Sequence, residues 1–217
     1  MGQKMLDVFK KELEQIRYAP FRGEVIKIIN TLPDYVLTIP SSSSGKYHPL
    51  DEIKEDGMIR HIKRFAIAAD EMVRMYYDES AWYYKYKDIL IATAILHDAL
   101  KQGSEKAGGH TVKEHPIYIY DIIKKYSEDT FSDSNRSLIQ ESEYSMFDEI
   151  KERLHLLGIA CLYHEGRWTI PESFERYPKD KLNSVEKRLV MMAHLADYIA
   201  SRRSFYDMMK DSFMENK

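Results

Sequence analysis

The feature that most constrains this chain is a nearly uninterrupted apolar segment that ends in two ligand-type side chains. Residues 88–100 spell DILIATAILHDAL, and their Ala and Leu residues recur at helical spacings. A run of this length and period predicts a buried core helix over 85–100. Burying His97 and Asp98 at its end costs free energy unless the two side chains are paired or bind a metal ion. Because adjacent helical residues project about 100° apart, one ion at the helix end can be reached by both.

Ligand-type residues enter apolar segments at two other places. Asp197 lies in the stretch LVMMAHLADYIA, and His61 opens an amphipathic segment that contains Ile62 and Phe65. Taken singly, such residues are usually satisfied core histidines or solvated aspartates. Three helices that each carry one or two of them into an apolar interior are typical of metal sites in helical bundles. A carboxylate beside an imidazole suits a divalent cation.

The rest of the chain also predicts helices and loops, and no segment alternates as a strand would. Apolar residues three and four apart predict helices over 5–17, 22–31, 58–78, about 111–126, 147–164 and 183–212. Pro20 is expected to end the first, Thr111 with Glu114 to cap the fourth, and Asn183 or Ser184 to cap the last. The Ser-, Gly- and Pro-rich stretch 40–57 predicts a loop, and 127–146 a polar surface insertion with some helix. The fold class is therefore all-α.

Composition limits the classes of function. Of the 217 residues, 44% are hydrophobic and 31% are charged, so the chain can build a core inside a solvated surface. A formal net charge of -3 disfavours a protein that wraps duplex nucleic acid. The single cysteine, Cys161, excludes an intrachain disulfide and a thiolate zinc cluster, and a cytoplasmic location is expected. Neither a signal peptide nor an apolar stretch of membrane length is evident, so no membrane partner is expected.

The order of His61, His97-Asp98 and Asp197 on separate helices resembles the HD-domain superfamily of metal-dependent phosphohydrolases. The stretch AILHDALKQG is similar to the segment that carries the family's His-Asp doublet, and HLADYIASR is similar to the last-helix segment of many members. The resemblance covers about residues 40–205. It implies a helical bundle with a metal site between its core helices.

The resemblance also divides the chain into a helical extension over 1–39 and an HD-type phosphohydrolase domain over 40–217. Segments like SSSSGKYHP precede the first helix in some phage-associated HD proteins. A Ser/Gly loop offers N–H groups and hydroxyls to an anion, and here Lys46 and His48 are expected to contact the substrate. Composition alone would make this loop a flexible linker, and the Walker A spacing is missing.

Two further histidines match a fuller version of the family pattern. His115-Pro116 resembles the His-Pro that opens the next helix in two-metal members, and His164-Glu165 resembles a motif of the same members, HD-GYP-type phosphodiesterases among them. No Asp-Gly…Gly-Tyr-Pro follows, so cyclic di-GMP hydrolysis is not implied. The implied ligand set is His61, His97, Asp98 and Asp197 for one ion, with Asp98 bridging to a second ion held by His115 and His164.

The resemblance implies hydrolysis of a phosphate ester by metal-activated water, with one or two ions of Mn, Fe, Ni, Co, Zn or Mg. Asp98 would take part in catalysis, and Lys101, one helical turn after His97, would touch a phosphoryl oxygen. Arg167 is a further candidate for binding the substrate, and Trp168 could stack on a base. The expected partner is a small phosphorylated compound, a nucleotide or a short oligonucleotide. A homo-oligomer stays open, because the long terminal helices could pair.

Other functions stay open at this point. The same ligand set would serve an HD-fold di-iron oxygenase, which metal identity and oxygen dependence would distinguish from a hydrolase. A non-catalytic module could instead keep a metal or nucleotide for structure or sensing, although the full set of ligand types argues against it. A chance resemblance would be excluded if His97, Asp98 and Asp197 met within bonding distance of one point.

Overall fold

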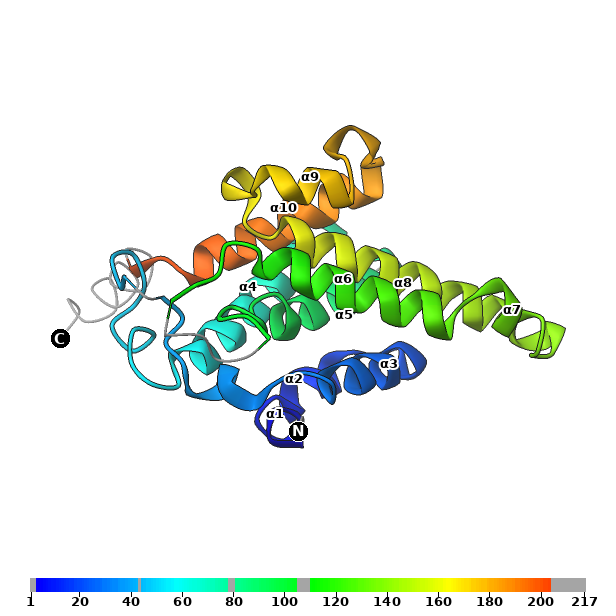
Figure 1. Cartoon of the computed structure of the whole chain (residues 1–217), viewed down its shortest axis with the longest axis horizontal. Coiled ribbons are helices and arrows are strands. Elements are labelled where there is room, and N and C mark those ends of the chain that lie inside the picture. Colours follow the sequence, from blue (N-terminus) through cyan, green and yellow to red (C-terminus); the bar gives the residue numbers. More distant parts are fainter. Residues whose placement is uncertain (1–2, 43, 78–80, 105–109, 204–217) are drawn as a thin grey trace.

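The computed structural model describes residues 3–42, 44–77, 81–104 and 110–203, and every regular element in these ranges is helical. The predicted all-α fold class is confirmed. Figure 1 shows the long helices side by side as a bundle, with α1–α3 along one edge and α9 along the opposite edge. None of the helices in the described ranges is both long and apolar enough to cross a membrane.

Long helices supply most of the core. They are α4 (Gly57–Tyr77), α5 (Ala81–Leu96), α6 (His115–Thr130), α8 (Tyr144–Tyr163) and α10 (Ser184–Ala200). Helix α4 packs on α5 and α10, and α6 packs on α8. Residues 89–96 of α5 are all buried, so this helix is surrounded on every side. That position explains why its sequence is apolar throughout rather than striped.

Shorter elements surround the bundle. They are α1 (Gln3–Val8), α2 (Lys10–Gln15), α3 (Ala19–Ile29), the 3-10 helix η1 (Asp34–Thr38), α7 (Asp133–Arg136), η2 (Glu141–Glu143), η3 (Gly166–Trp168), α9 (Pro171–Arg176) and η4 (Lys179–Lys181). As predicted for 40–57, the described residues between η1 and α4 form no regular element. Helices α7 and η2 lie in the predicted surface insertion.

The N-terminal helices differ from their prediction. The helix expected over 5–17 is two helices, because Phe9 between them leaves the helical region, with φ −102° and ψ 20°. Its ring is fully buried, so the chain bends there to place the ring in the core. Pro20 does not end a helix but lies in the first turn of α3. A proline is tolerated there, since the first N–H groups of a helix lack intrahelical partners anyway.

Helix ends differ from the prediction in other places as well. Glu114 occupies the N-cap of α6 without a side-chain bond, so the predicted capping box of Thr111 and Glu114 is wrong. Helix α5 ends at Leu96 rather than at residue 100. Helix α10 ends at Ala200. Residues 204–212 of the predicted last helix lie outside the described residues, and so does residue 78 of the helix predicted over 58–78. The cap of α10 is Asn183, whose side chain accepts the N–H groups of the first turn.

The N-terminal helices share the core of the bundle. Asp88 of α5 accepts the N–H groups of Arg17 at 2.8 Å and Tyr18 at 3.0 Å, just before α3. The same buried carboxylate contacts the guanidinium of Arg153 on α8 at 3.2 Å. One side chain therefore joins α5, α8 and the start of α3. The predicted domain boundary between residues 39 and 40 stays a prediction. The buried core residues before it include Met5, Phe9, Ile16, Phe21, Val25 and Ile29.

Asp88→Asn should lower the free energy of unfolding by about 2 kcal/mol, because an amide nitrogen would face a donor and the buried guanidinium would lose one of its two carboxylates. Urea denaturation followed by circular dichroism measures the change. Asp129→Asn is the control, since the side chain of Asp129 pairs, among the described residues, only with Lys125 on the surface, a contact worth about 0.5 kcal/mol or less. Equal midpoints for the two variants would contradict the structural role of Asp88.

Candidate metal centre

The His-Asp doublet lies at the C-terminal end of α5, inside the protein. His97 is 0% exposed and Asp98 is 2% exposed. The backbone N–H of His97 still donates to Thr93 at 2.8 Å, and its ring Nδ1 lies 3.0 Å from the carbonyl oxygen of Ala94. A ring nitrogen beside a carbonyl must carry the proton, so Nε2 of His97 is left as an acceptor that faces the neighbouring helices.

One group of donor atoms is formed where α4, α5 and α10 meet. His61 Nε2 lies 3.2 Å from His97 Nε2 and 3.1 Å from Asp197 Oδ1. The candidate ligand atoms of these three residues all lie within 4.8 Å of one another. His61 is buried, whereas the side chain of Asp197 is 20% exposed. The group is therefore accessible only from the Asp197 side.

A second group of donor atoms adjoins the first through Asp98. Its Oδ1 lies 2.8 Å from His115 Nε2 on α6 and 3.7 Å from His164 Nε2 at the end of α8. Its Oδ2 lies 3.4 Å from His97 Nε2. Asp98 Oδ1 and His115 Nε2 are both buried, yet neither has a hydrogen-bond partner among the described residues. Two buried atoms that converge at 2.8 Å without hydrogen-bond geometry fit a pair of metal ligands.

Three of the histidines are oriented in the same way. His115 Nδ1 lies 2.7 Å from the carbonyl oxygen of Val112, and His164 Nδ1 lies 2.7 Å from that of Cys161. Like His97, each ring uses the carbonyl three residues earlier and turns Nε2 toward Asp98. Metal-binding histidines almost always donate their other N–H in this manner, which fixes the tautomer. Buried His, Asp and Glu groups of this structure could thus hold a metal ion.

Charges around Asp98 favour a site that is ready for cations. Burial alone would raise the pKa of Asp98, but the Lys101 ammonium and nearby imidazoles hold it well below its ordinary value. Burial and the neighbouring His97 lower the pKa of His164 to about 3. At neutral pH the carboxyl group is therefore ionised and the His164 ring is neutral, as metal ligands must be.

His61 differs, because two carboxylates face it. Burial would lower its pKa, but Asp197 on one side and Glu52 on the other raise the pKa of His61 to about 9. The same pairing lowers the pKa of Asp197 below its ordinary value, against the effect of burial. In the absence of an ion, His61 is therefore a protonated ring held between two anions.

Lys101 contacts Asp98 directly. Its Nζ lies 2.5 Å from Asp98 Oδ2, and only 14% of its side chain is exposed. Burial would lower the pKa of Lys101, but the Asp98 carboxylate raises it. In this structure the ammonium offsets charge within the cluster. Contact with a phosphoryl oxygen, expected from the sequence, stays a prediction.

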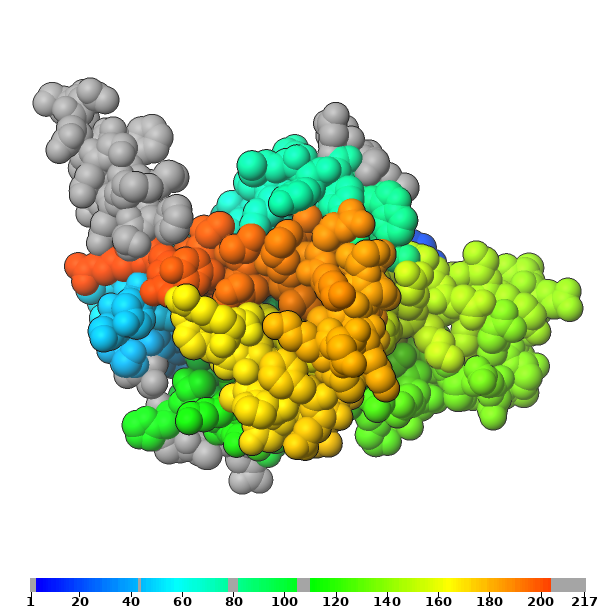
Figure 2. Space-filling model, turned by 90° about the horizontal axis from the view of Figure 1, so that it is seen from above, coloured from blue at the N-terminus to red at the C-terminus, as the bar shows by residue number. Residues whose placement is uncertain are grey.

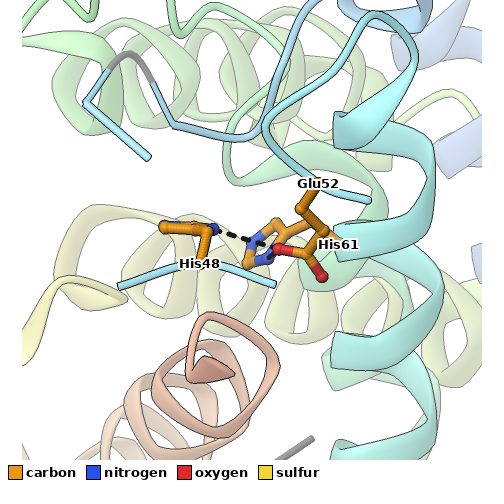
Figure 3. A group of neighbouring side chains, drawn as sticks. All are labelled: His48, Glu52 and His61. Atoms are coloured by element: carbon orange, nitrogen blue, oxygen red, sulfur yellow. Dashed lines mark hydrogen bonds and ion pairs between the residues drawn. The ribbon is translucent and has the colours of Figure 1, made fainter. Parts of the chain in front are cut away.

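Glu52, a fully buried carboxylate behind His61, was not predicted from the sequence. In Figure 3 its carboxylate lies close to the rings of both His48 and His61. Glu52 Oε2 is 3.0 Å from His48 Nδ1 and 3.6 Å from His61 Nδ1, and it also accepts the hydroxyl of Ser41 at 3.1 Å. The guanidinium of Arg64 holds its other oxygen. Glu52 comes from an irregular loop, so no periodicity could have indicated it.

Two of the three candidate substrate-binding residues line one cavity, and the third does not. His48 and Arg167 line a cavity of about 620 Å³ that also reaches Asp197 and Glu165. Burial raises the pKa of Glu165, next to the centre, to about 7. Lys46 does not line this cavity, and its ammonium lies 5.2 Å above the ring of Tyr47. The structure therefore brings two of the three predicted contacts to the opening of the metal centre.

Glu52→Gln should weaken metal binding by about 10- to 100-fold, because an amide orients the His61 ring less firmly than a carboxylate does. Competition with a metal-sensitive dye measures the affinity. The matched control is Glu186→Gln, which alters another buried Glu–His contact, 2.7 Å from His155, away from the centre. Equal losses of affinity in both variants would show that the effect of Glu52 is only structural.

Three helices, α4, α6 and α10, and the residues that follow two others, α5 and α8, thus bring together the six candidate ligands expected from the sequence. They are His61, His97, Asp98, His115, His164 and Asp197. A ligand atom of each residue lies within 4.8 Å of a ligand atom of another residue in the set. Comparison with known proteins adds no assignment: no protein-family model, no curated protein and no solved structure matches the chain.

Proposed function

We propose that the chain is a metal-dependent phosphohydrolase of the HD-domain type with two adjacent divalent ions. The placement of Asp98 carries the proposal, because its two oxygens face different histidine groups. Oδ2 faces His97, which adjoins His61 and Asp197, whereas Oδ1 faces His115 and His164. A carboxylate between two donor groups is the arrangement by which two-metal hydrolytic sites join their ions.

The ions would be held by residues already oriented for them. Divalent ions in such a site stabilise charge on phosphoryl oxygens and activate water at neutral pH. The chain itself fixes the tautomers of His97, His115 and His164 through backbone carbonyls. The surrounding cationic groups keep Asp98 ionised. The ammonium of Lys101 offsets part of the negative charge of this carboxylate.

Access to the site supports a substrate with an anionic end. The 620 Å³ cavity reaches Asp197, the exposed member of the cluster, and Arg167 lies in its wall. Its volume is in the range of about 300–1,000 Å³ typical of small-molecule sites. A cation beside a cluster of metal ligands suits a phosphate ester, with a nucleotide as the leading candidate.

The test is elemental analysis of protein purified without chelator, combined with hydrolysis of phosphomonoester and phosphodiester reporters in Mn²⁺, Ni²⁺, Co²⁺ or Mg²⁺. We expect about two ions per chain and turnover that EDTA abolishes and added ion restores. Bound metal with no hydrolysis under any ion would contradict the proposal. Oxygen consumption by iron-loaded protein would instead identify the oxygenase alternative.

A further inference from the structure

Two arginines line the cavity beside the metal centre. Figure 2 shows the segment after α8, which carries Arg167, beside the end of α10, which Arg202 follows, with the loop before α4 next to them. Both arginines border the same 620 Å³ space as Asp197 and Glu165. The cavity thus has a metal-ligand side and a guanidinium side.

Aromatic rings hold these guanidinium groups in place. The Cζ atom of Arg202 lies 4.1 Å from the ring centre of Tyr198 and 4.8 Å from that of Tyr47. Arg167 lies 4.3 Å from the ring centre of Trp168. Cation–π contacts position the plane of a guanidinium, but they leave its N–H donors unused. The rings therefore orient the arginines without satisfying them.

Neither guanidinium has an acidic partner among the residues that the structure describes. Nε of Arg202 is buried and makes no hydrogen bond there. Elsewhere in the bundle, the guanidinium groups of Arg136 and Arg153 each contact a carboxylate, at 3.0 Å and 2.7 Å. A buried donor without a partner costs free energy, and an arginine fork matches a phosphoryl group. These two arginines are thus arranged for an anion that the described residues do not provide.

We infer that Arg202 and Arg167 form a subsite for a second phosphoryl group, so that the substrate is a nucleotide phosphorylated at two separate positions, such as a nucleoside 3′,5′-bisphosphate. The inference rests on the proposed function, which places the scissile phosphoryl group at the metal cluster. The cavity is much larger than one phosphoryl group, so it can take both ends of such a molecule. The rings of Trp168 and Tyr47, each about half exposed, also line this cavity.

The experiment compares binding of adenosine 3′,5′-bisphosphate, adenosine 5′-monophosphate and adenosine 5′-diphosphate to the metal-loaded protein. Fluorescence of Trp168 reports binding in a Trp82→Phe background, and product formation is followed in the same samples. We expect the bisphosphate to bind about 10- to 100-fold more tightly than the monophosphate. Arg202→Ala should remove this preference and change monophosphate binding by less than about threefold.

Arg188→Ala is the matched control, because Arg188 lies on the exposed face of α10 and bonds to the hydroxyl of Tyr77. If Arg202→Ala does not fold, Arg202→Gln tests the same loss of charge. Equal binding of bisphosphate and monophosphate would overturn the inference even if the protein hydrolyses both. Equal binding of the bisphosphate and the diphosphate would overturn the requirement for separate positions. An Arg202-dependent preference without hydrolysis would support the subsite and reject the proposed function.

Discussion

Replacing Asp98 with Asn is expected to lower the rate of hydrolysis on the order of a thousandfold and to reduce the metal content to one ion per chain or fewer. Partners that only orient a metal ligand are worth about 10- to 100-fold. Asp98 faces His97 with one oxygen and His115 and His164 with the other, so it serves both donor groups. The amide keeps the shape of the side chain but loses its charge and half of its acceptor capacity.

The matched control is Asp88→Asn, a buried aspartate on the same helix α5 but far along it from the doublet. Both variants lose a buried carboxylate that faces a cation, Lys101 for Asp98 and Arg153 for Asp88. Both should therefore be less stable, but only Asp98→Asn should lose metal. Elemental analysis after gel filtration and initial rates at saturating ion separate the two effects. A parental metal content and a rate within threefold of the parent in Asp98→Asn would reject the bridging role.

The main helices and the ligand types of this protein follow from short-range pattern. The apolar run before His97 could only be a buried helix or a buried strand, and its length favoured the helix. Because buried polar side chains need partners, His97, Asp98 and Asp197 could be expected to meet. The sequence also indicated His61 from its place at the start of an amphipathic helix. The sequence could not predict which of these side chains contact one another. In particular, it could not predict that Asp98 lies between His97 on one side and His115 and His164 on the other.

Features made by tertiary contact escaped the sequence. Glu52 reaches His61 from an irregular loop, and that loop is closed by the backbone bond from Ser41 to Glu52 at 2.9 Å. The cation–π contact between Arg202 and Tyr47 joins segments that are more than a hundred residues apart. Local rules also failed where packing competed with them. Phe9 interrupts a regular helical pattern because its ring is needed in the core.

Metal affinity should rise by about 150-fold between pH 6.5 and pH 9, because an ion must displace the proton of His61. The pKa of this ring in the metal-free fold is about 9, above its ordinary value of 6.5, as a result of Asp197 and Glu52 outweighing burial. Below pH 9, each unit of pH therefore costs about tenfold in apparent affinity. Calorimetric titration in two buffers of different ionisation enthalpy should show about one proton released from this ring per chain at pH 7.5.

The stability of the metal-free protein should follow the opposite trend. A raised pKa in the folded state stabilises the fold fully below the unfolded pKa of about 6.5, and this contribution is lost as the pH rises through about 9. The rise in the pKa of His61 from 6.5 to about 9 corresponds to about 3 kcal/mol of folding stability. Melting in EDTA should thus become easier over the same interval in which ions bind more tightly. His155→Gln, which removes a half-exposed histidine away from the centre, should leave both trends unchanged. Constant affinity and constant stability from pH 6.5 to 9 would show that His61 does not hold its proton between the two carboxylates.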